Sequence, residues 1–88
     1  MSSLIDITDQ LDHNQVYTFV GKFDYDHNRF ETIDGNIIQC YAYRHHSRYM
    51  KNHLVAVNLN YTLGFVNAWV IFQAVILDEE EVTKTYQK

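Results

Sequence analysis

Residues 16–43, VYTFVGKFDYDHNRFETIDGNIIQCYAY, contain three strand patterns and the turns that separate them. In the first pattern, over residues 15–25, one face of the predicted strand is aromatic and carries Tyr17, Phe19, Phe23 and Tyr25. Gly21 interrupts the alternation. A bulge or sharp coil at a glycine would let one long strand serve two halves of a barrel.

Two turns and two further strands complete this stretch. The sequence DHN at 26–28 turns the chain, and RFETI at 29–33 predicts a second strand. Asp34 and Gly35 then form a strong hairpin signal, because Asp-Gly supplies the positive φ angles of a tight turn. The third strand, IIQCYAY at 37–43, has a small apolar face of Ile38, Cys40 and Ala42 and an opposite face of Gln39, Tyr41 and Tyr43.

The flanking segments extend the pattern in both directions. Within residues 1–14, Leu4, Ile7 and Leu11 have helical spacing, which predicts a short N-terminal helix. After residue 43 come a connector that extends to residue 53, a strand at 53–61, a turn around Gly64, a strand at 66–78 and a tail at 79–88. Five strands with an insert between the third and fourth predict an all-β fold in a single domain over 1–88, the five-stranded OB-fold Greek-key barrel. An Sm-like or SH3-like barrel is the nearest alternative.

Composition limits the classes of function. The chain has 88 residues and a formal net charge of −4, so it is expected to attract few phosphates and to be a poor stand-alone ligand for nucleic acid. The single cysteine, Cys40, excludes an internal disulfide and fits a reducing compartment. The first fifteen residues lack the features of a signal peptide, and no apolar stretch reaches the length of a membrane helix. We therefore expect a soluble intracellular protein.

The connector YAYRHHSRYMKNH, residues 41–53, gathers the positive charge of the chain. One interpretation is a solvated linker helix whose cations face water. The other is a nucleic-acid site, in which exposed tyrosines stack on bases while cations hold the phosphates. The candidates for that site are Tyr41, Tyr43, Arg44, Arg48 and Lys51.

Metal binding and catalysis have little support in the sequence. His45 and His46 are adjacent and point apart, and His53 belongs to a different element, so no ligand spacing typical of zinc is present. Cys40 lies in mid-strand on a small apolar face, where cysteine usually packs in the core. The chain also lacks a nucleophile elbow and a phosphate loop. We therefore expect neither an enzyme nor a cofactor.

The strand at 66–78 is apolar on both faces. A small barrel buries only one of them, so the second face, with Trp69, Ile71, Val75 and Leu77, needs another cover. The N-terminal helix is one candidate. A partner protein is the other, because contiguous apolar patches on soluble domains usually mark interfaces. These four residues are the candidates for a partner interface.

Three short motifs resemble a known family: TFVGKF at 18–23, IDGN at 33–36 and WVIFQAVILDEEE at 69–81. Together they resemble the smallest subunit of replication protein A, and the smallest subunit of the telomere-capping CST complex is similar almost as well. The resemblance implies a small, mainly structural OB-fold subunit that contacts single-stranded DNA weakly or indirectly. It also implies larger OB-fold subunits as partners and a nuclear location. Such subunits usually continue into a C-terminal helix that contacts their partners; with about ten residues after the last strand, that mode of assembly is expected to be reduced.

Two other functions are consistent with the sequence. One is a self-contained interaction barrel that homodimerises through the apolar face of the strand at 66–78. The other is a small barrel that binds RNA through Tyr41 and Tyr43.

Overall fold

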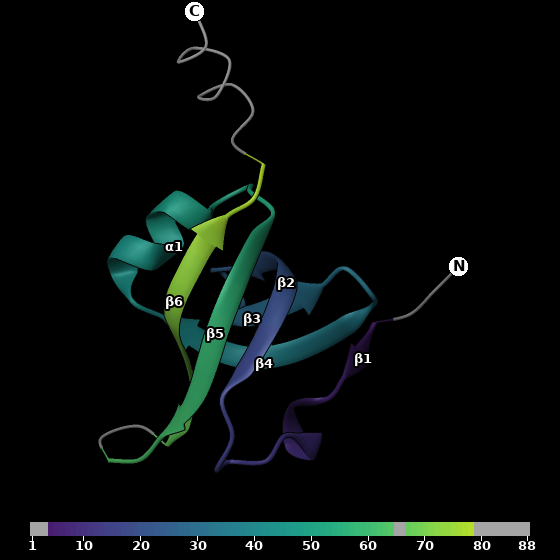
Figure 1. The fold of residues 1–88 in the computed structure, drawn as a ribbon, viewed down its shortest axis with the longest axis vertical. Coiled ribbons are helices and arrows are strands. Elements are labelled where there is room, and N and C mark those ends of the chain that lie inside the picture. The colour runs from purple at the N-terminus through teal and green to yellow at the C-terminus, as the bar shows by residue number, and fades with distance from the viewer. Residues whose placement is uncertain (1–3, 65–66, 79–88) are drawn as a thin grey trace, which may run out of the picture.

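A computed structural model describes residues 4–64 and 67–78 and consists mainly of β-strands (Figure 1). The tail expected at 79–88, the acidic end of the third family motif and Val66 lie outside the described residues. No helix of the described part is long and apolar enough to cross a membrane. The elements are β1 (Ile5–Asp6), the 3₁₀ helix η1 (Thr8–Gln10), β2 (Tyr17–Asp24), β3 (Arg29–Thr32), β4 (Asn36–Ala42), α1 (Arg44–Met50), β5 (Val55–Thr62) and β6 (Ala68–Ile76).

The six strands form one sheet in the order β1-β4-β3-β2-β5-β6, with a further pairing between β4 and β6. The β4–β6 pair is parallel, whereas β2–β3, β3–β4, β2–β5 and β5–β6 are antiparallel. The strands β2, β3, β4, β6 and β5 therefore pair in a closed circuit, because β5 pairs again with β2. This arrangement confirms the expected all-β class and is compatible with a barrel-like fold.

Gly21 is the residue at which β2 changes partner. It pairs with Val55 of β5 and with Thr32 of β3, at the point where the two ladders meet. A Cβ atom on Gly21 would overlap the carbonyl oxygen of Glu31 and lie 2.7 Å from the Cα of Thr32. Only glycine allows β3 to approach β2 this closely, so one strand can serve two halves of the sheet.

The predicted Asp34-Gly35 turn is confirmed between β3 and β4. Gly35 has a φ of 91°, in the region that glycine adopts most readily. The Thr32 hydroxyl donates to the Asp34 carboxylate at 2.5 Å and accepts the Asn36 backbone N–H at 2.9 Å. The Gly35 N–H also donates to the Thr32 carbonyl at 3.2 Å. These bonds fix the register of the hairpin.

The short N-terminal helix predicted from the spacing of Leu4, Ile7 and Leu11 is reduced to one 3₁₀ turn, and a strand precedes it. In the described part of that segment, β1 pairs in parallel with β4, and η1 provides only one 3₁₀ turn. The backbone N–H groups of Ile5 and Ile7 donate to the carbonyls of Gly35 and Ile37 at 3.0 and 2.9 Å. The edge of β4 therefore supplies hydrogen-bond acceptors for these backbone N–H groups. Pairing there is more stable than a short isolated helix, which is marginal in water.

The core is formed by side chains of β2 to β6 together with one residue of α1. Its buried side chains are Phe23, Phe30, Ile38, Cys40, Met50, Val55, Val57, Leu59, Trp69 and Ile71. The connector between β4 and β5 contains the helix α1, which lies beside β6 at one end of the sheet (Figure 1). It contributes Met50, which is fully buried.

The expectation that Trp69 and Ile71 lie on a surface face of β6 is wrong, because both are core residues. The reason is a bulge. Leu59 pairs with Ile71 while the preceding Asn58 pairs with Gln73, so Phe72 is an extra residue in β6. The bulge exchanges the faces of the strand. Before it Trp69 and Ile71 point inward, and after it Val75 points outward.

Candidate functional site

The helix α1 presents its cations to solvent because two small features anchor its other side. Ser47 is buried, and its hydroxyl donates to the carbonyls of Arg44 at 3.1 Å and Tyr43 at 3.3 Å. Met50 enters the core one turn later. Arg44, Arg48 and Lys51 remain exposed, and none of them forms an ion pair with a described carboxylate.

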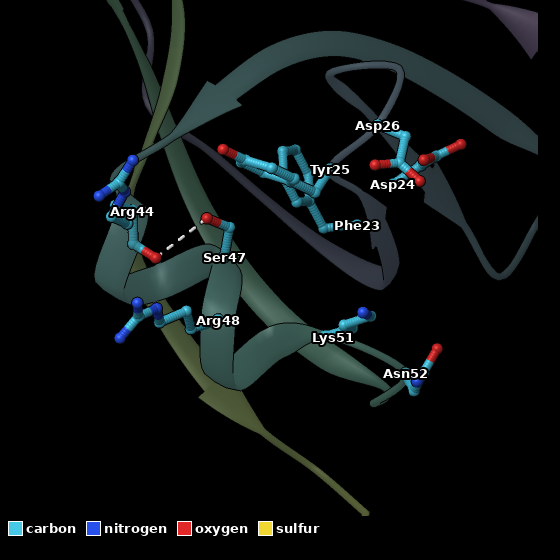
Figure 2. Close-up of a pocket in the computed structure, with 9 residues that line it drawn as sticks. All are labelled: Phe23, Asp24, Tyr25, Asp26, Arg44, Ser47, Arg48, Lys51 and Asn52. Carbon is cyan, nitrogen blue, oxygen red and sulfur yellow. Dashed lines mark hydrogen bonds between the residues drawn. The ribbon is translucent and has the colours of Figure 1, made fainter.

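These three cations line a pocket of about 530 Å³ between α1 and the β2–β3 turn (Figure 2). We call it the basic pocket; it is lined by Phe23, Asp24, Tyr25, Asp26, Arg44, Ser47, Arg48, Lys51 and Asn52. Figure 2 shows the ring of Tyr25 reaching toward the N-terminal end of α1, with the two aspartates on the opposite side of the pocket. Three cations and two carboxylates leave the lining with a formal charge of +1.

Asp24 already has partners of its own. His27 Nδ1 lies 2.8 Å from Asp24 Oδ2, and Arg29 Nε lies 3.8 Å from the same oxygen. The hydrogen bond from His27, with a smaller contribution from the charge of Arg29, lowers the pKa of the Asp24 carboxyl. Asp24 therefore stays ionised at neutral pH and opposes the binding of anions in the basic pocket.

Tyr41 lines a different cavity, so the five nucleic-acid candidates do not form one cluster. This second cavity, the aromatic groove, has a volume of about 440 Å³. Its lining consists of Thr8, Asp9, His13, His27, Asn28, Gln39, Cys40, Tyr41, Tyr61, Asn67, Ala68 and Trp69. Tyr43 lines neither cavity; it is the N-cap residue of α1, exposed between Tyr41 and the cations.

A cluster of rings forms one wall of the aromatic groove. The His13 ring stacks on Tyr61 with centroids 3.7 Å apart and planes 4° apart. Trp69 meets Tyr61 at 5.4 Å and Tyr17 at 5.6 Å in edge-to-face geometry. Because only 2% of Trp69 is exposed whereas 47% of Tyr41 is, Trp69 supports the wall and Tyr41 offers a free surface.

Sequence reasoning missed Tyr61 and His13. Tyr61 follows Val55, Val57 and Leu59 at alternate positions of the strand at 53–61, and those three residues are buried. Tyr61 lies at the end of this buried face, just before the turn at Gly64. That position could have indicated that its ring lies at the rim of the core. Nothing in the local sequence of His13 indicates its contact with a residue 48 positions later.

The histidines and the cysteine form no metal centre in the described residues, where no group of three or more His, Cys, Asp or Glu side chains could hold a metal. The expectation that His45 and His46 point apart is wrong, because their rings contact each other with centroids 4.3 Å apart. His53 lies apart from them, 2.9 Å from Asp78. Burial raises the pKa of the Cys40 thiol to about 12. The thiol is therefore protonated at neutral pH and is a poor nucleophile.

The four candidates for a partner interface are divided between the core and the surface. Trp69 and Ile71 are buried inside the protein and cannot contact a partner directly. Val75 and Leu77 are exposed, as the interface requires. Val75 continues a row of apolar side chains on the outer surface of the sheet, through its pairing with Ala56 and the pairing of Ala56 with Val20. We call Val20, Ala56 and Val75 the outer row.

Comparison with known proteins adds no relative to this description. No protein-family model matches the chain, and neither a curated protein nor a solved structure matches it.

Proposed function

We propose that the chain is an OB-fold domain that acts as the small, mainly structural subunit of a single-stranded-DNA-binding complex. The observation that carries the proposal is the circuit of strand pairs β2-β3-β4-β6-β5-β2, with α1 inserted between β4 and β5. This circuit has five strands, and the helix lies between the third and the fourth of them in chain order, β4 and β5. That connectivity is the one expected for a five-stranded Greek-key barrel of the OB type.

The position of the aromatic groove supports a nucleic-acid role. OB-folds bind oligonucleotides on the face of their second and third strands, together with the loops that follow the first and fourth strands. In this chain Gln39 and Tyr41 come from the third strand of the circuit, Asn28 from the first of those loops and Asn67 from the second. A base stacked on Tyr41 would therefore lie where side-chain amides can reach its edge.

The basic pocket extends this site toward α1. Tyr41 and Tyr43 are both exposed and two residues apart on extended backbone, and Arg44 follows directly. A single strand could pass from the groove over Tyr43 to the cations of α1. The two carboxylates of the pocket and the net charge of −4 keep this affinity low.

A subunit role is supported by the outer row. Val75 is 55% exposed and, with Val20 and Ala56, forms an uncharged strip across three strands. We propose that larger OB-fold subunits cover this strip and supply most of the DNA affinity, in a nuclear complex. The outer row also supports the second candidate function, a homodimer formed through the same surface.

Direct titration of the isolated protein tests the nucleic-acid part. Fluorescence anisotropy with a labelled single strand of about 12 nucleotides should give a dissociation constant between roughly 10⁻⁴ and 10⁻⁶ M at physiological salt. Replacing Arg44, Arg48 and Lys51 with Glu should abolish binding, because the pocket then repels phosphate. Unchanged binding by that variant would make α1 a solvated linker. An RNA strand of the same sequence, bound more tightly than DNA, would favour the RNA-binding alternative.

Recovery of partners tests the subunit part. Tagged protein isolated from its native cells should bring down larger OB-fold subunits, and Val75→Glu should lower their recovery, because a buried charge without a counterion destabilises an interface. Tyr41→Leu is the control and should leave recovery unchanged. Size-exclusion chromatography of the isolated protein separates the alternative: a dimer that Val75→Glu converts to a monomer would support homodimerisation.

A further inference from the structure

The ring of His13 occupies the surface of Tyr61 that a nucleobase would use. Its centroid is 3.7 Å from that of Tyr61 and the two planes differ by only 4°. Flat stacking of this kind is how aromatic side chains hold bases in single-strand-binding proteins. On the other contact of Tyr61, Trp69 approaches with its ring plane at 71° and a centroid distance of 5.4 Å. A base can therefore stack on this face of Tyr61 only if the His13 ring leaves.

Within residues 4–64 and 67–78, ring contacts are what hold the His13 side chain in this position. Besides Tyr61, its ring meets Trp69 at 5.7 Å, and among the described residues it makes no side-chain hydrogen bond. Hydrogen bonds fix the loop on either side of His13: the Asp12 N–H donates to the Tyr17 side-chain hydroxyl at 2.8 Å, and the Gln15 N–H donates to the Asp12 carbonyl at 3.0 Å. Neither hydrogen bond involves the His13 side chain, so displacement of the ring does not require either bond to break.

The same N-terminal segment places a negative charge in the groove. Asp9 of η1 lines the aromatic groove, which has no lysine or arginine in its lining. The segment is firmly attached to β4. Thr8 Oγ1 accepts the Gln39 backbone N–H at 2.8 Å, and Gln39 Nε2 donates to Asp6 at 2.7 Å. The carboxylate of Asp9 therefore stays beside the groove even when the His13 ring is displaced, and it repels a phosphate there.

We propose that the N-terminal segment, residues 4–13, is a built-in competitor of the nucleic-acid site: His13 covers the stacking surface of Tyr61 in the free protein, and a base of the bound strand displaces it. This inference rests on the proposed binding of single strands in the aromatic groove. It assigns a regulatory role to the segment and gives a further reason to expect weak binding by a chain with several exposed aromatic rings.

Removing the ring should strengthen binding. We expect His13→Ala to lower the dissociation constant for the single-stranded oligonucleotide about three- to tenfold, the factor that corresponds to one aromatic pair. His53→Ala is the matched control, since His53 is a histidine that lines neither cavity and contacts Asp78; it should leave the constant unchanged. Unchanged or weaker binding by His13→Ala would overturn the inference, and weaker binding would make His13 part of the stacking surface.

Two further measurements separate this inference from the proposed function. In the free protein the Tyr61 ring current should shift the His13 ring protons upfield in the NMR spectrum, and saturating oligonucleotide should remove that shift; a retained shift contradicts displacement. Tyr41→Leu tests the groove itself. If it weakens binding while His13→Ala does not strengthen it, only the competition fails. If Tyr41→Leu has no effect, or if no variant binds, the proposed site fails as well.

Discussion

Trp69 shows how one residue changes from a surface anchor to a core residue. It is 2% exposed and packs edge-to-face against Tyr17 and Tyr61. Replacing a buried tryptophan with alanine leaves a cavity and typically costs about 3–5 kcal/mol. We therefore expect Trp69→Ala to unfold much of the protein or to lower its free energy of unfolding by about that amount in urea titrations. Val75→Ala, at an exposed site of the same strand, should change it by less than about 0.5 kcal/mol. Equal stability of the two variants would contradict the core assignment.

Cys40 is a second residue whose chemistry is set by burial. Desolvation raises the pKa of its thiol to about 12 from the ordinary value of 9.0, and a hydrogen bond with the Phe30 backbone offsets this only in part. We expect the folded protein to resist a thiol reagent such as Ellman's reagent at pH 8, while the protein unfolded in urea reacts at once. Rapid labelling of the folded protein would contradict this.

The same shift in the pKa of Cys40 implies that stability depends on pH. As pH rises above about 9 the unfolded chain loses the proton first, so the free energy of unfolding should fall between about pH 9 and 12.

At the scale of elements, β2 depends on the absence of a side chain at Gly21. A methyl group there would collide with the backbone of Glu31 and Thr32, which cannot move without breaking the β2–β3 ladder. We expect Gly21→Ala to lower the free energy of unfolding by more than about 2 kcal/mol, as overpacking against rigid backbone does. Gly35→Ala is the control. Its Cβ would meet open space, so only the positive φ is unfavourable, at about 1 kcal/mol. If both variants were equally stable, close approach would not explain Gly21.

Local sequence predicted the elements whose cause is local. The Asp34-Gly35 turn follows from backbone preferences of two residues, and α1 follows from a connector of the right length between strands. The strand at 66–78 was predicted correctly and is present as β6. The N-terminal segment and the buried face of β6 were predicted wrongly, because they depend on distant partners. Ile5 and Ile7 bond to the edge of β4, and the extra residue Phe72 is visible only in the pairing of β6 with β5.

The candidate site divides in the same manner. The exposure of Tyr41 and of the α1 cations follows from alternation and charge, and the structure agrees with both. Their separation into two cavities does not follow from sequence, because it depends on how β4, β6 and the β2–β3 turn meet. The contact of His13 with Tyr61 is equally non-local, since the N-terminal segment reaches β5 only after it has paired with β4.

For the whole molecule, the distribution of charge limits what the site can bind. The chain carries seven Lys and Arg against eleven Asp and Glu, yet three of those cations line one pocket without ion-pair partners among the described carboxylates. The aromatic groove beside it contains Asp9 and no such cation. Contacts with phosphate should therefore come from α1 and contacts with bases from the groove, so the two contributions to affinity can be measured separately.

Salt dependence separates them. Each phosphate neutralised in a single strand contributes about −0.7 to the slope of log K against log salt concentration, so three cations give a slope no steeper than about −2. We expect Arg48→Gln to make the slope shallower by about 0.7, because one counterion fewer is released. Lys22→Gln is the matched control. Lys22 is exposed on β2 and lines neither of the two cavities, and its replacement removes the same charge from the protein. It should leave the slope unchanged. Tyr41→Leu should weaken binding at every salt concentration without changing the slope, since stacking releases no counterions. A wild-type slope near −4, or equal effects of Arg48→Gln and Lys22→Gln, would mean that the strand follows the general charge of the protein and does not pass over α1.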